Sequence, residues 1–462
     1  MESMNRWIAL CLLPCAACFT PGDPPAGDTD SGSTGSTTAT AGPTTASDTA
    51  PSTTDTPTTT SPSGSETTAS PETSDTDDDS TTTTGGADES STGEPAECGN
   101  AVAEPGELCF GDVASFATVN PVFALAIGDM DGNGTLDLIT AESNDSEAAF
   151  YFGTGMGGFG GYSGDAFSPT TRDVATGHFT LGDDDIDAVW ALEDDTAMVG
   201  VLLSDGAGSF PIPFDTYNAG SEGHAVATGD IDGDGLDDIV SVGSNSSGLG
   251  SQVSTFFSAN NGTFSNPATA QQANGTYTDV ITAEFTGNDV LDVAFVYRNN
   301  TASTVRACRG NGSGLFNNST CESLEAGPNA PRLAAGDFDA DGNVDIIATQ
   351  TGGPNLGFFA GQGNGTFADV NLVNIGSPSF AIAAGDLDND GNDDAVITLM
   401  SGAVVILRGG AMPDIAETLD FPGSADCGAR DVQLGDFNED GALDIAVPCS
   451  DNAEIVVFNS EV

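Results

Sequence analysis

The sequence of 462 residues contains no lysine, and all eight of its basic residues are arginines. Against them stand 70 acidic residues, which give a formal net charge of −62 at pH 7. A surface with so few cations repels phosphate groups and the anionic leaflet of a membrane. This balance argues against nucleic acids and membrane surfaces as partners. It favours cations, or ligands that carry positive charge.

Long apolar runs and histidines are also scarce. No stretch reaches the roughly 18 apolar residues of a transmembrane helix. Nucleophilic hydrolysis usually needs a histidine or another base beside the nucleophile, and the sequence has only two histidines. His178 falls in an acidic loop, and His224 has no nucleophile near it in the sequence. No pair stands out among the 70 acids for a polysaccharide-degrading mechanism, so we expect no enzymatic activity.

The one apolar segment lies at the N-terminus, and residues 1–17 are typical of a secretory signal peptide. The run from Cys15 to Cys18 resembles the lipobox of bacterial lipoproteins, which implies lipidation of Cys18, although the family usually has leucine in place of Cys15. The alternative is ordinary cleavage and free secretion. We therefore expect export across the inner membrane, either to the outer membrane and cell surface as a lipoprotein or to the extracellular space.

Residues 18–97 are dominated by Ser, Thr, Gly, Pro, Ala, Asp and Glu, and no aromatic residue follows Phe19 in this stretch. Such a segment cannot bury enough apolar area to offset the entropy of ordering its chain. We predict a disordered linker that holds the following domain away from a membrane anchor at Cys18.

Six cysteines remain beyond the N-terminal segment, an even number that favours disulfides in an exported protein. Residues 98–109, CGNAVAEPGELC, resemble a short Cys-rich repeat of secreted bacterial surface proteins. Cys308 and Cys321 fall on adjacent predicted strands of one hairpin. Cys427 and Cys449 fall just before and just after a pair of predicted strands near the C-terminus. The predicted disulfides are Cys98–Cys109, Cys308–Cys321 and Cys427–Cys449.

Residues 110–462 contain seven repeats, each with a short apolar strand, an acidic Gly-containing loop and a second apolar strand. The first positions of the loops are residues 129, 178, 230, 284, 337, 386 and 436, so the period is 49 to 54 residues. About four short strands in a unit of this length predict an all-β fold, a seven-bladed β-propeller. The last repeat is one strand short, and residues 109–119 look like the missing outer strand. We expect strand exchange to close the ring.

The repeats resemble FG-GAP/VCBS-type repeats, the units of the integrin α-subunit propeller and of many bacterial surface proteins. The resemblance covers about 350 residues, 110–462. In the integrin propeller, metal loops sit on the lower face and ligands meet the upper face. The resemblance therefore implies a recognition or adhesion module with the same division between its faces.

Five of the seven loops have the form D-x-[DN]-x-[DN]-G-x-x-D. Side-chain oxygens at positions one, three, five and nine, with the carbonyl of position seven, supply the hard donors that Ca²⁺ requires. The alternative is that these residues only form turns. The predicted side-chain ligands are Asp129, Asp131, Asn133 and Asp137; Asp230, Asp232, Asp234 and Asp238; Asp337, Asp339, Asp341 and Asp345; Asp386, Asp388, Asp390 and Asp394; and Asp436, Asn438, Asp440 and Asp444. The predicted carbonyl donors are Thr135, Leu236, Asn343, Asn392 and Ala442.

The other two loops depart from this pattern. The second repeat has His178 at its first position, and the fourth has Glu284 there and lacks the glycine of position six. We expect both loops to be empty or weak, which leaves about five Ca²⁺ sites.

Five or six residues before each loop, the chain should pass the upper mouth of the central channel. Cationic side chains recur there in a very acidic protein, which favours a positive ring able to hold a carboxylate or sulfate. The alternative is that the arginines only pair with nearby acids. The candidate ligand-binding residues are Arg172, His224, Arg332 and Arg430.

Together these features predict a monomeric, Ca²⁺-binding recognition module that holds a glycan or protein ligand on its upper face. The alternative is a structural scaffold of the envelope with no specific soluble ligand.

Overall fold

The computed structural model describes residues 106, 108–142, 147–166, 170–182, 185–194, 197–208, 214–219, 222–244, 250–273, 275–299, 302–317, 319–411, 413–421 and 427–461. The predicted signal peptide, the linker, Cys18 and Cys98 lie outside these residues. In the part of the chain that is described, no helix is long and apolar enough to cross a membrane.

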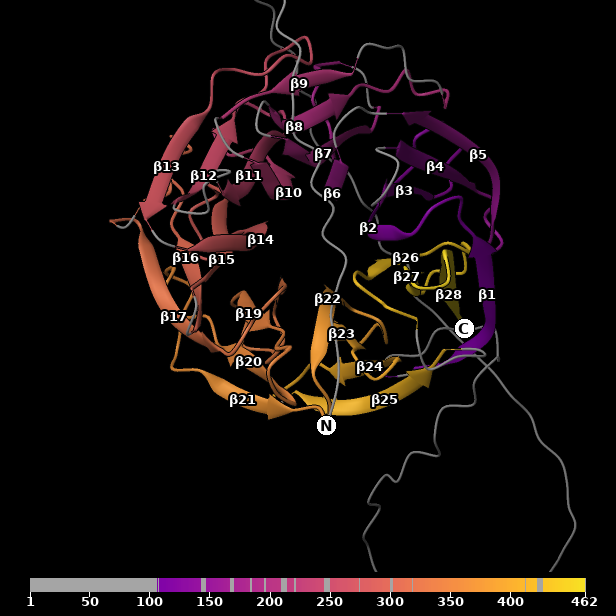
Figure 1. Ribbon diagram of the computed structural model, residues 1–462. Coiled ribbons are helices and arrows are strands. Elements are labelled where there is room, and N and C mark those ends of the chain that lie inside the picture. Colours follow the sequence, from indigo (N-terminus) through magenta and orange to yellow (C-terminus); the bar gives the residue numbers. More distant parts are fainter. Residues whose placement is uncertain are drawn as a thin grey trace, which may run out of the picture. The chain divides into compact units, whose positions relative to one another are not determined.

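Seven four-stranded antiparallel sheets are arranged as blades around a central axis (Figure 1). Blades one to three comprise β2 (Val122–Gly128), β3 (Asp137–Glu142), β4 (Glu147–Gly153) and β5 (Phe159–Ala166); β6 (Thr170–Gly177), β7 (Asp187–Asp194), β8 (Ala197–Leu202) and β9 (Asp215–Tyr217); and β10 (Glu222–Gly229), β11 (Asp238–Ser244), β12 (Gly250–Phe256) and β13 (Ala268–Ala273). Blades four to six comprise β14 (Thr276–Ala283), β15 (Asp292–Arg298), β16 (Ser303–Cys308) and β17 (Cys321–Gly327); β18 (Leu333–Gly336), β19 (Asp345–Ala348), β20 (Asn355–Phe359) and β21 (Asn371–Asn374); and β22 (Ser379–Gly385), β23 (Asp394–Leu399), β24 (Ala403–Arg408) and β25 (Asp414–Asp420).

Blade seven joins the two ends of the domain. Its inner three strands are β26 (Gln433–Gly435), β27 (Asp444–Cys449) and β28 (Glu454–Ser460), and its outer strand is β1 (Phe110–Ala117). β1 pairs antiparallel with β28, and Phe116 lies opposite Ile455. This pairing covers the edge that β28 would otherwise expose. The predicted all-β, seven-bladed propeller and its closure by strand exchange are confirmed.

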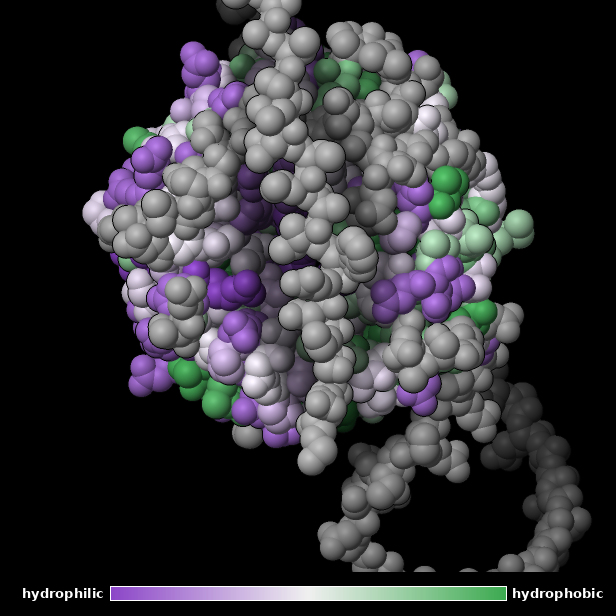
Figure 2. All heavy atoms as spheres, viewed as in Figure 1, coloured by the Kyte–Doolittle hydropathy of each residue, from purple (hydrophilic) through white to green (hydrophobic). Residues whose placement is uncertain are grey.

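The core lies between neighbouring blades and is built mainly from the second and third strands. The described residues of β3, β11 and β23 are buried at every position, so both faces of these strands pack against other sheets. That explains why apolar residues stand at consecutive positions in these segments instead of alternating strictly with polar ones. Trp190 of blade two is fully buried and meets Phe150 of blade one edge to face, with ring centroids 6.2 Å apart. On the face shown in Figure 2, the coloured atoms are mostly hydrophilic, with hydrophobic residues in small separate groups.

Two of the predicted disulfides are confirmed. Cys308 and Cys321 lie directly opposite each other on β16 and β17 and are bonded. Cys427 is bonded to Cys449, the last residue of β27. Cys109 is disulfide-bonded too, and its predicted partner Cys98 lies outside the described residues.

Candidate functional site

All seven blades share a buried aspartate at the start of the second strand. Each is at most 2 % exposed. In blade five, one oxygen of Asp345 accepts the backbone N–H of Phe338 in the loop at 3.0 Å, and the other accepts that of Gly361 beyond the third strand at 2.7 Å. The same pair of bonds is made by Asp137, Asp187, Asp238, Asp292, Asp394 and Asp444. We call these seven residues the clamp aspartates.

The clamp does not depend on the metal pattern. Asp292 follows the degenerate loop of blade four, and its bonds to Phe285 and Gly310 are 2.7 and 2.6 Å long. The sequence pattern alone indicated only a metal ligand at the ninth loop position. Its retention in both degenerate loops, as Asp187 and Asp292, was the signal of this second role.

In the five loops of the predicted pattern, the chain wraps around the first aspartate. In blade five, Asp337 Oδ1 accepts the N–H of Asp341 at 3.1 Å and Oδ2 accepts that of Gly342 at 2.9 Å. The equivalent bonds form in blades one, three, six and seven. Gly342 has φ of 86°, a conformation that side chains with a Cβ rarely adopt. This explains the glycine at position six.

Four of the predicted loops gather three carboxylates each, with one oxygen per residue within 4.8 Å of the others. The groups are Asp129, Asp131 and Asp137; Asp230, Asp232 and Asp234; Asp337, Asp339 and Asp345; and Asp386, Asp388 and Asp394. They lie at the lower face, which we define as the end of the ring where first strands lead into second strands.

The donors in these clusters fit a divalent cation. All are carboxylate oxygens, which hard cations such as Ca²⁺ prefer. Partial burial and neighbouring carboxylates raise the pKa of Asp232 and of Asp339. Asp339 Oδ1 is also buried without a hydrogen-bond partner. A bound cation would satisfy that oxygen and offset the crowding of like charges. The predicted carbonyl donors remain predictions.

The other three loops differ, and none contributes a three-acid group within the described residues. Blade seven has the amide of Asn438 at the third position, and it donates to Asp440 Oδ2 at 3.0 Å. In blade two, His178 Nδ1 lies 3.0 Å from the carbonyl oxygen of Asp185. In blade four, Glu284 Oε1 accepts the N–H groups of Thr286 and Gly287. Weak binding in blades two and four stays a prediction.

The opposite end of the inner strands, the upper face, carries a repeated irregularity. In blade one, Val122 pairs with Glu142 but the next paired residue is Ala124, opposite Ala141, so Phe123 is skipped. The equivalent residues Arg172, His224 and Thr278 are skipped in blades two, three and four, and the register of β22 breaks around Phe380. A bulge leaves its extra residue unpaired and changes the direction of its side chain. It therefore frees a residue at the upper mouth in each of these five blades.

Arg430 of blade seven is held by aromatic rings from the two adjacent blades. Its guanidinium carbon lies 4.9 Å from the ring centre of Phe123 and 5.8 Å from that of Phe380. The arginine is exposed, and within the described residues no carboxylate lies at ion-pair distance from it. Beside it is a pocket of about 230 Å³, lined by Phe380, Leu399, Met400, Gly402, Gly428, Ala429, Arg430 and Asp451.

Arg172 and His224 occupy the equivalent positions of blades two and three. Arg172 is exposed and pairs with Glu193 at 2.5 Å. His224 is half-buried, and its ring nitrogens meet the carbonyl of Tyr277 at 2.8 Å and the hydroxyl of Ser244 at 3.2 Å. Burial, reinforced by the charge of Arg172, lowers the pKa of His224.

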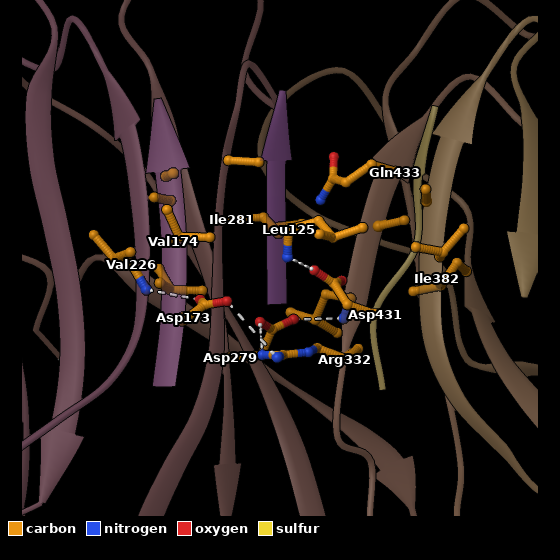
Figure 3. Close-up of a pocket in the computed structure, with 18 of the residues that line it drawn as sticks. Leu125, Asp173, Val174, Val226, Asp279, Ile281, Arg332, Ile382, Asp431 and Gln433 are labelled. Carbon is orange, nitrogen blue, oxygen red and sulfur yellow. Dashed lines mark hydrogen bonds and ion pairs between the residues drawn. The ribbon is translucent and has the colours of Figure 1, made fainter. Parts of the chain in front are cut away.

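Arg332 is not placed with Arg172 and Arg430. It lies one residue closer to its loop than they do, and Pro331 occupies the equivalent rim position. Its side chain enters the central channel, where Nη1 donates to Asp279 Oδ1 at 3.1 Å and Nη2 lies 3.7 Å from Asp173 Oδ1 (Figure 3). The four candidate ligand residues therefore do not form one positive ring.

The channel has a volume of about 460 Å³ and is lined by the inner strands of all seven blades. Besides Arg332, its charged side chains are Asp173, Asp279 and Asp431, which the sequence analysis missed. Each accepts a backbone N–H from the next blade around the ring. The donors are Val226 at 3.1 Å, Leu333 at 2.6 Å and Leu125 at 2.7 Å, respectively. These aspartates therefore join adjacent blades.

Burial raises the pKa of Asp279 to about 7 and that of Asp431 to about 6, even though Arg332 lowers both. Burial also raises the pKa of Asp173. Three carboxyl groups thus share one guanidinium in the channel.

The model of the FG-GAP-like repeat family matches residues 337–397, which run from the loop of blade five to the second strand of blade six. The resemblance to these repeats is confirmed for that stretch. No curated protein matches the chain.

Solved structures of similar fold include two crystal structures of BBS1N in complex with ARL6DN, one soaked with lead and one with mercury. The first is 10 % identical with a TM-score of 0.51, and covers 76 % of this chain and 96 % of that chain. The second is 11 % identical with a TM-score of 0.52, and covers 77 % of this chain and 99 % of that chain. At this identity the likeness shows the propeller fold alone.

Proposed function

We propose that this chain is a calcium-binding recognition module, exported to the cell surface or the extracellular space, that holds a glycan or protein ligand on its upper face. The observation that carries the proposal is the side-chain order at the rim. Blades six, seven, one, two and three place Phe380, Arg430, Phe123, Arg172 and His224 at equivalent positions. We call these five residues the rim arc.

The rim arc suits a ligand that has both an acidic group and an apolar face. Rings on two sides hold the Arg430 guanidinium without neutralising it. Its planar donors remain able to pair with a carboxylate or sulfate in a bidentate manner. The half-buried rings and the adjoining pocket offer apolar surface, which fits one face of a sugar ring or an aliphatic side chain.

Calcium would support this face from the other end of the inner strands. The carboxylates of blades one, three, five and six would hold the ion, and bound Ca²⁺ would supply positive charge that offsets their mutual repulsion. This stabilises the loops that fix the lower ends of the inner strands. The proposal assigns binding and no bond-making chemistry to the chain.

The test is binding of the calcium-loaded protein to a panel of acidic and neutral glycans and matrix proteins. Arg430→Ala and the double variant with Arg172→Ala are compared with Arg309→Ala, which removes an exposed arginine just after the third strand of blade four. We expect saturable binding that the rim variants lose and the control keeps.

Binding that survives both rim variants would retain recognition but exclude the rim arc as its site. If a folded, calcium-loaded sample binds nothing on the panel, the envelope scaffold becomes the better interpretation.

A further inference from the structure

Blade six differs at the end of its third strand from blades one, three and five, the other blades that have a three-carboxylate cluster. The second oxygen of each clamp aspartate accepts the N–H of a residue at or just beyond the end of the third strand. We compare the residue that directly precedes this donor in each blade. These residues are Phe152, Leu203, Phe257, Arg309, Ala360, Arg408 and Asn459 in blades one to seven. Only blades four and six have a cation there. Blade four lacks the acidic loop pattern, so Arg408 is the single case beside a carboxylate cluster.

Arg408 is in contact with that cluster. Its Nε lies 2.6 Å from Oδ2 of Asp388, the third-position residue of the loop, and Asp388 is only 1 % exposed. The equivalent residues Asp131, Asp232 and Asp339 have no arginine at ion-pair distance among the described residues. The loop of blade six therefore contains a positive charge that the loops of blades one, three and five lack.

The same guanidinium reaches the segment that precedes β1. Arg408 Nη2 donates to the carbonyl oxygen of Gly106 at 3.1 Å, and the N–H of Gly106 donates to the carbonyl oxygen of Asp388 at 2.8 Å. Arg408, Asp388 and Gly106 thus form a closed set of contacts. This set connects the end of the Cys-rich motif to the metal loop of blade six.

We propose that Arg408 is a built-in cation of the blade-six loop, which lowers the affinity of this loop for Ca²⁺ and couples calcium entry to loss of the contact between Arg408 and Gly106. The inference rests on the proposed calcium binding by the other loops. A guanidinium beside Asp388 neutralises part of the charge that attracts the ion, and it repels a divalent ion a few ångströms away. Calcium that takes Asp388 as a ligand must displace Arg408, which removes one of the two hydrogen bonds that Gly106 makes among the described residues.

The test is calorimetric titration of the purified chain with Ca²⁺, for wild type, Arg408→Gln and the matched control Arg309→Gln. Apart from any weak binding in blades two and four, we expect a tight class of sites in blades one, three and five and a weaker site in blade six of wild type. Arg408→Gln should raise the affinity of the weaker site about tenfold or more. Arg309→Gln should leave both classes unchanged. Equal affinities in all three proteins would overturn the inference.

A second pair of variants tests the inference even if Arg408→Gln does not fold. Asp388→Ala should abolish the weaker site and spare the tight class, whereas Asp339→Ala should remove one tight site. If both variants remove sites of the same affinity, Arg408 has no special role although calcium binding stands. If wild type itself takes up no Ca²⁺, the proposed function loses its metal sites and this inference falls with them.

Discussion

The two ends of the inner strands follow different rules. At the lower end, all seven blades keep the clamp aspartate with the same two backbone bonds, even where the loop has lost its metal pattern. At the upper end, the residues that stand six positions before each loop differ in chemistry. They are Phe123, Arg172, His224, Thr278, Pro331, Phe380 and Arg430. The residues that repeat in every blade are therefore those that hold the blade together. The residues that vary from blade to blade are those that can select a partner.

Removing calcium should produce the largest change, because it acts on several lower loops at once. Each occupied site adds about 2.7 kcal/mol when free Ca²⁺ is a hundredfold above Kd, so four sites together contribute on the order of 10 kcal/mol. We expect the melting temperature to fall by roughly 10 °C or more when EDTA replaces Ca²⁺. Scanning calorimetry in the two buffers measures this. Identical melting curves would mean that the carboxylate clusters bind no stabilising ion.

The clamp can be separated from the metal sites in blade four. Asp292→Ala leaves the buried N–H groups of Phe285 and Gly310 without their acceptor, which should cost about 3 kcal/mol or more. Because this loop lacks the calcium pattern, the loss should be equal in Ca²⁺ and in EDTA. Asp345→Ala in blade five is the matched control, and its loss should be larger in Ca²⁺. Denaturant unfolding of both variants in both buffers measures the difference, and a calcium-dependent loss for Asp292→Ala would contradict a purely structural clamp.

The fold could be predicted from the sequence because its signal is repeated. Seven loops at one spacing fix the number of blades, and the missing strand after β28 points to the segment that became β1. Both bonded cysteine pairs among the described residues follow from the same strand assignment.

The upper end could not be predicted in the same detail, because a one-residue bulge decides which way a side chain faces. Arg172 and Asp173 are neighbours in the sequence, yet the first is exposed at the rim and the second lines the channel. Arg332 stands five residues before its loop, as Asp173 does, whereas Arg172 stands six before its own. Grouping Arg332 with the rim arginines was therefore wrong by one residue. The channel aspartates could not be predicted, because the sequence alone does not show which of two neighbouring residues faces the channel. That depends on how the strands pair.

The channel predicts a dependence of stability on pH. The pKa of Asp279 is about 7 in the folded chain, against an ordinary value of 3.8, so the folded state binds more protons between about pH 4 and pH 7. Stability from this group is present at low pH and is lost as pH rises through 7. Asp279→Asn removes the titration, and it should gain roughly 2–4 kcal/mol relative to wild type from pH 4 to pH 8. Unfolding in EDTA across this range measures the gain, and parallel curves would contradict it.

Substitutions at the rim should have the smallest effects on stability. This would distinguish residues that bind a ligand from residues that hold the fold together. Arg172 and Glu193 are both well exposed, so Arg172→Ala should change the free energy of unfolding by less than about 1 kcal/mol. Arg430→Ala loses contacts with two rings at an exposed site, a cost of about 1 kcal/mol. Denaturant unfolding in Ca²⁺ measures both. If either variant instead lost as much stability as Asp292→Ala, the rim would be part of the framework, and the variation along it would no longer argue for a ligand.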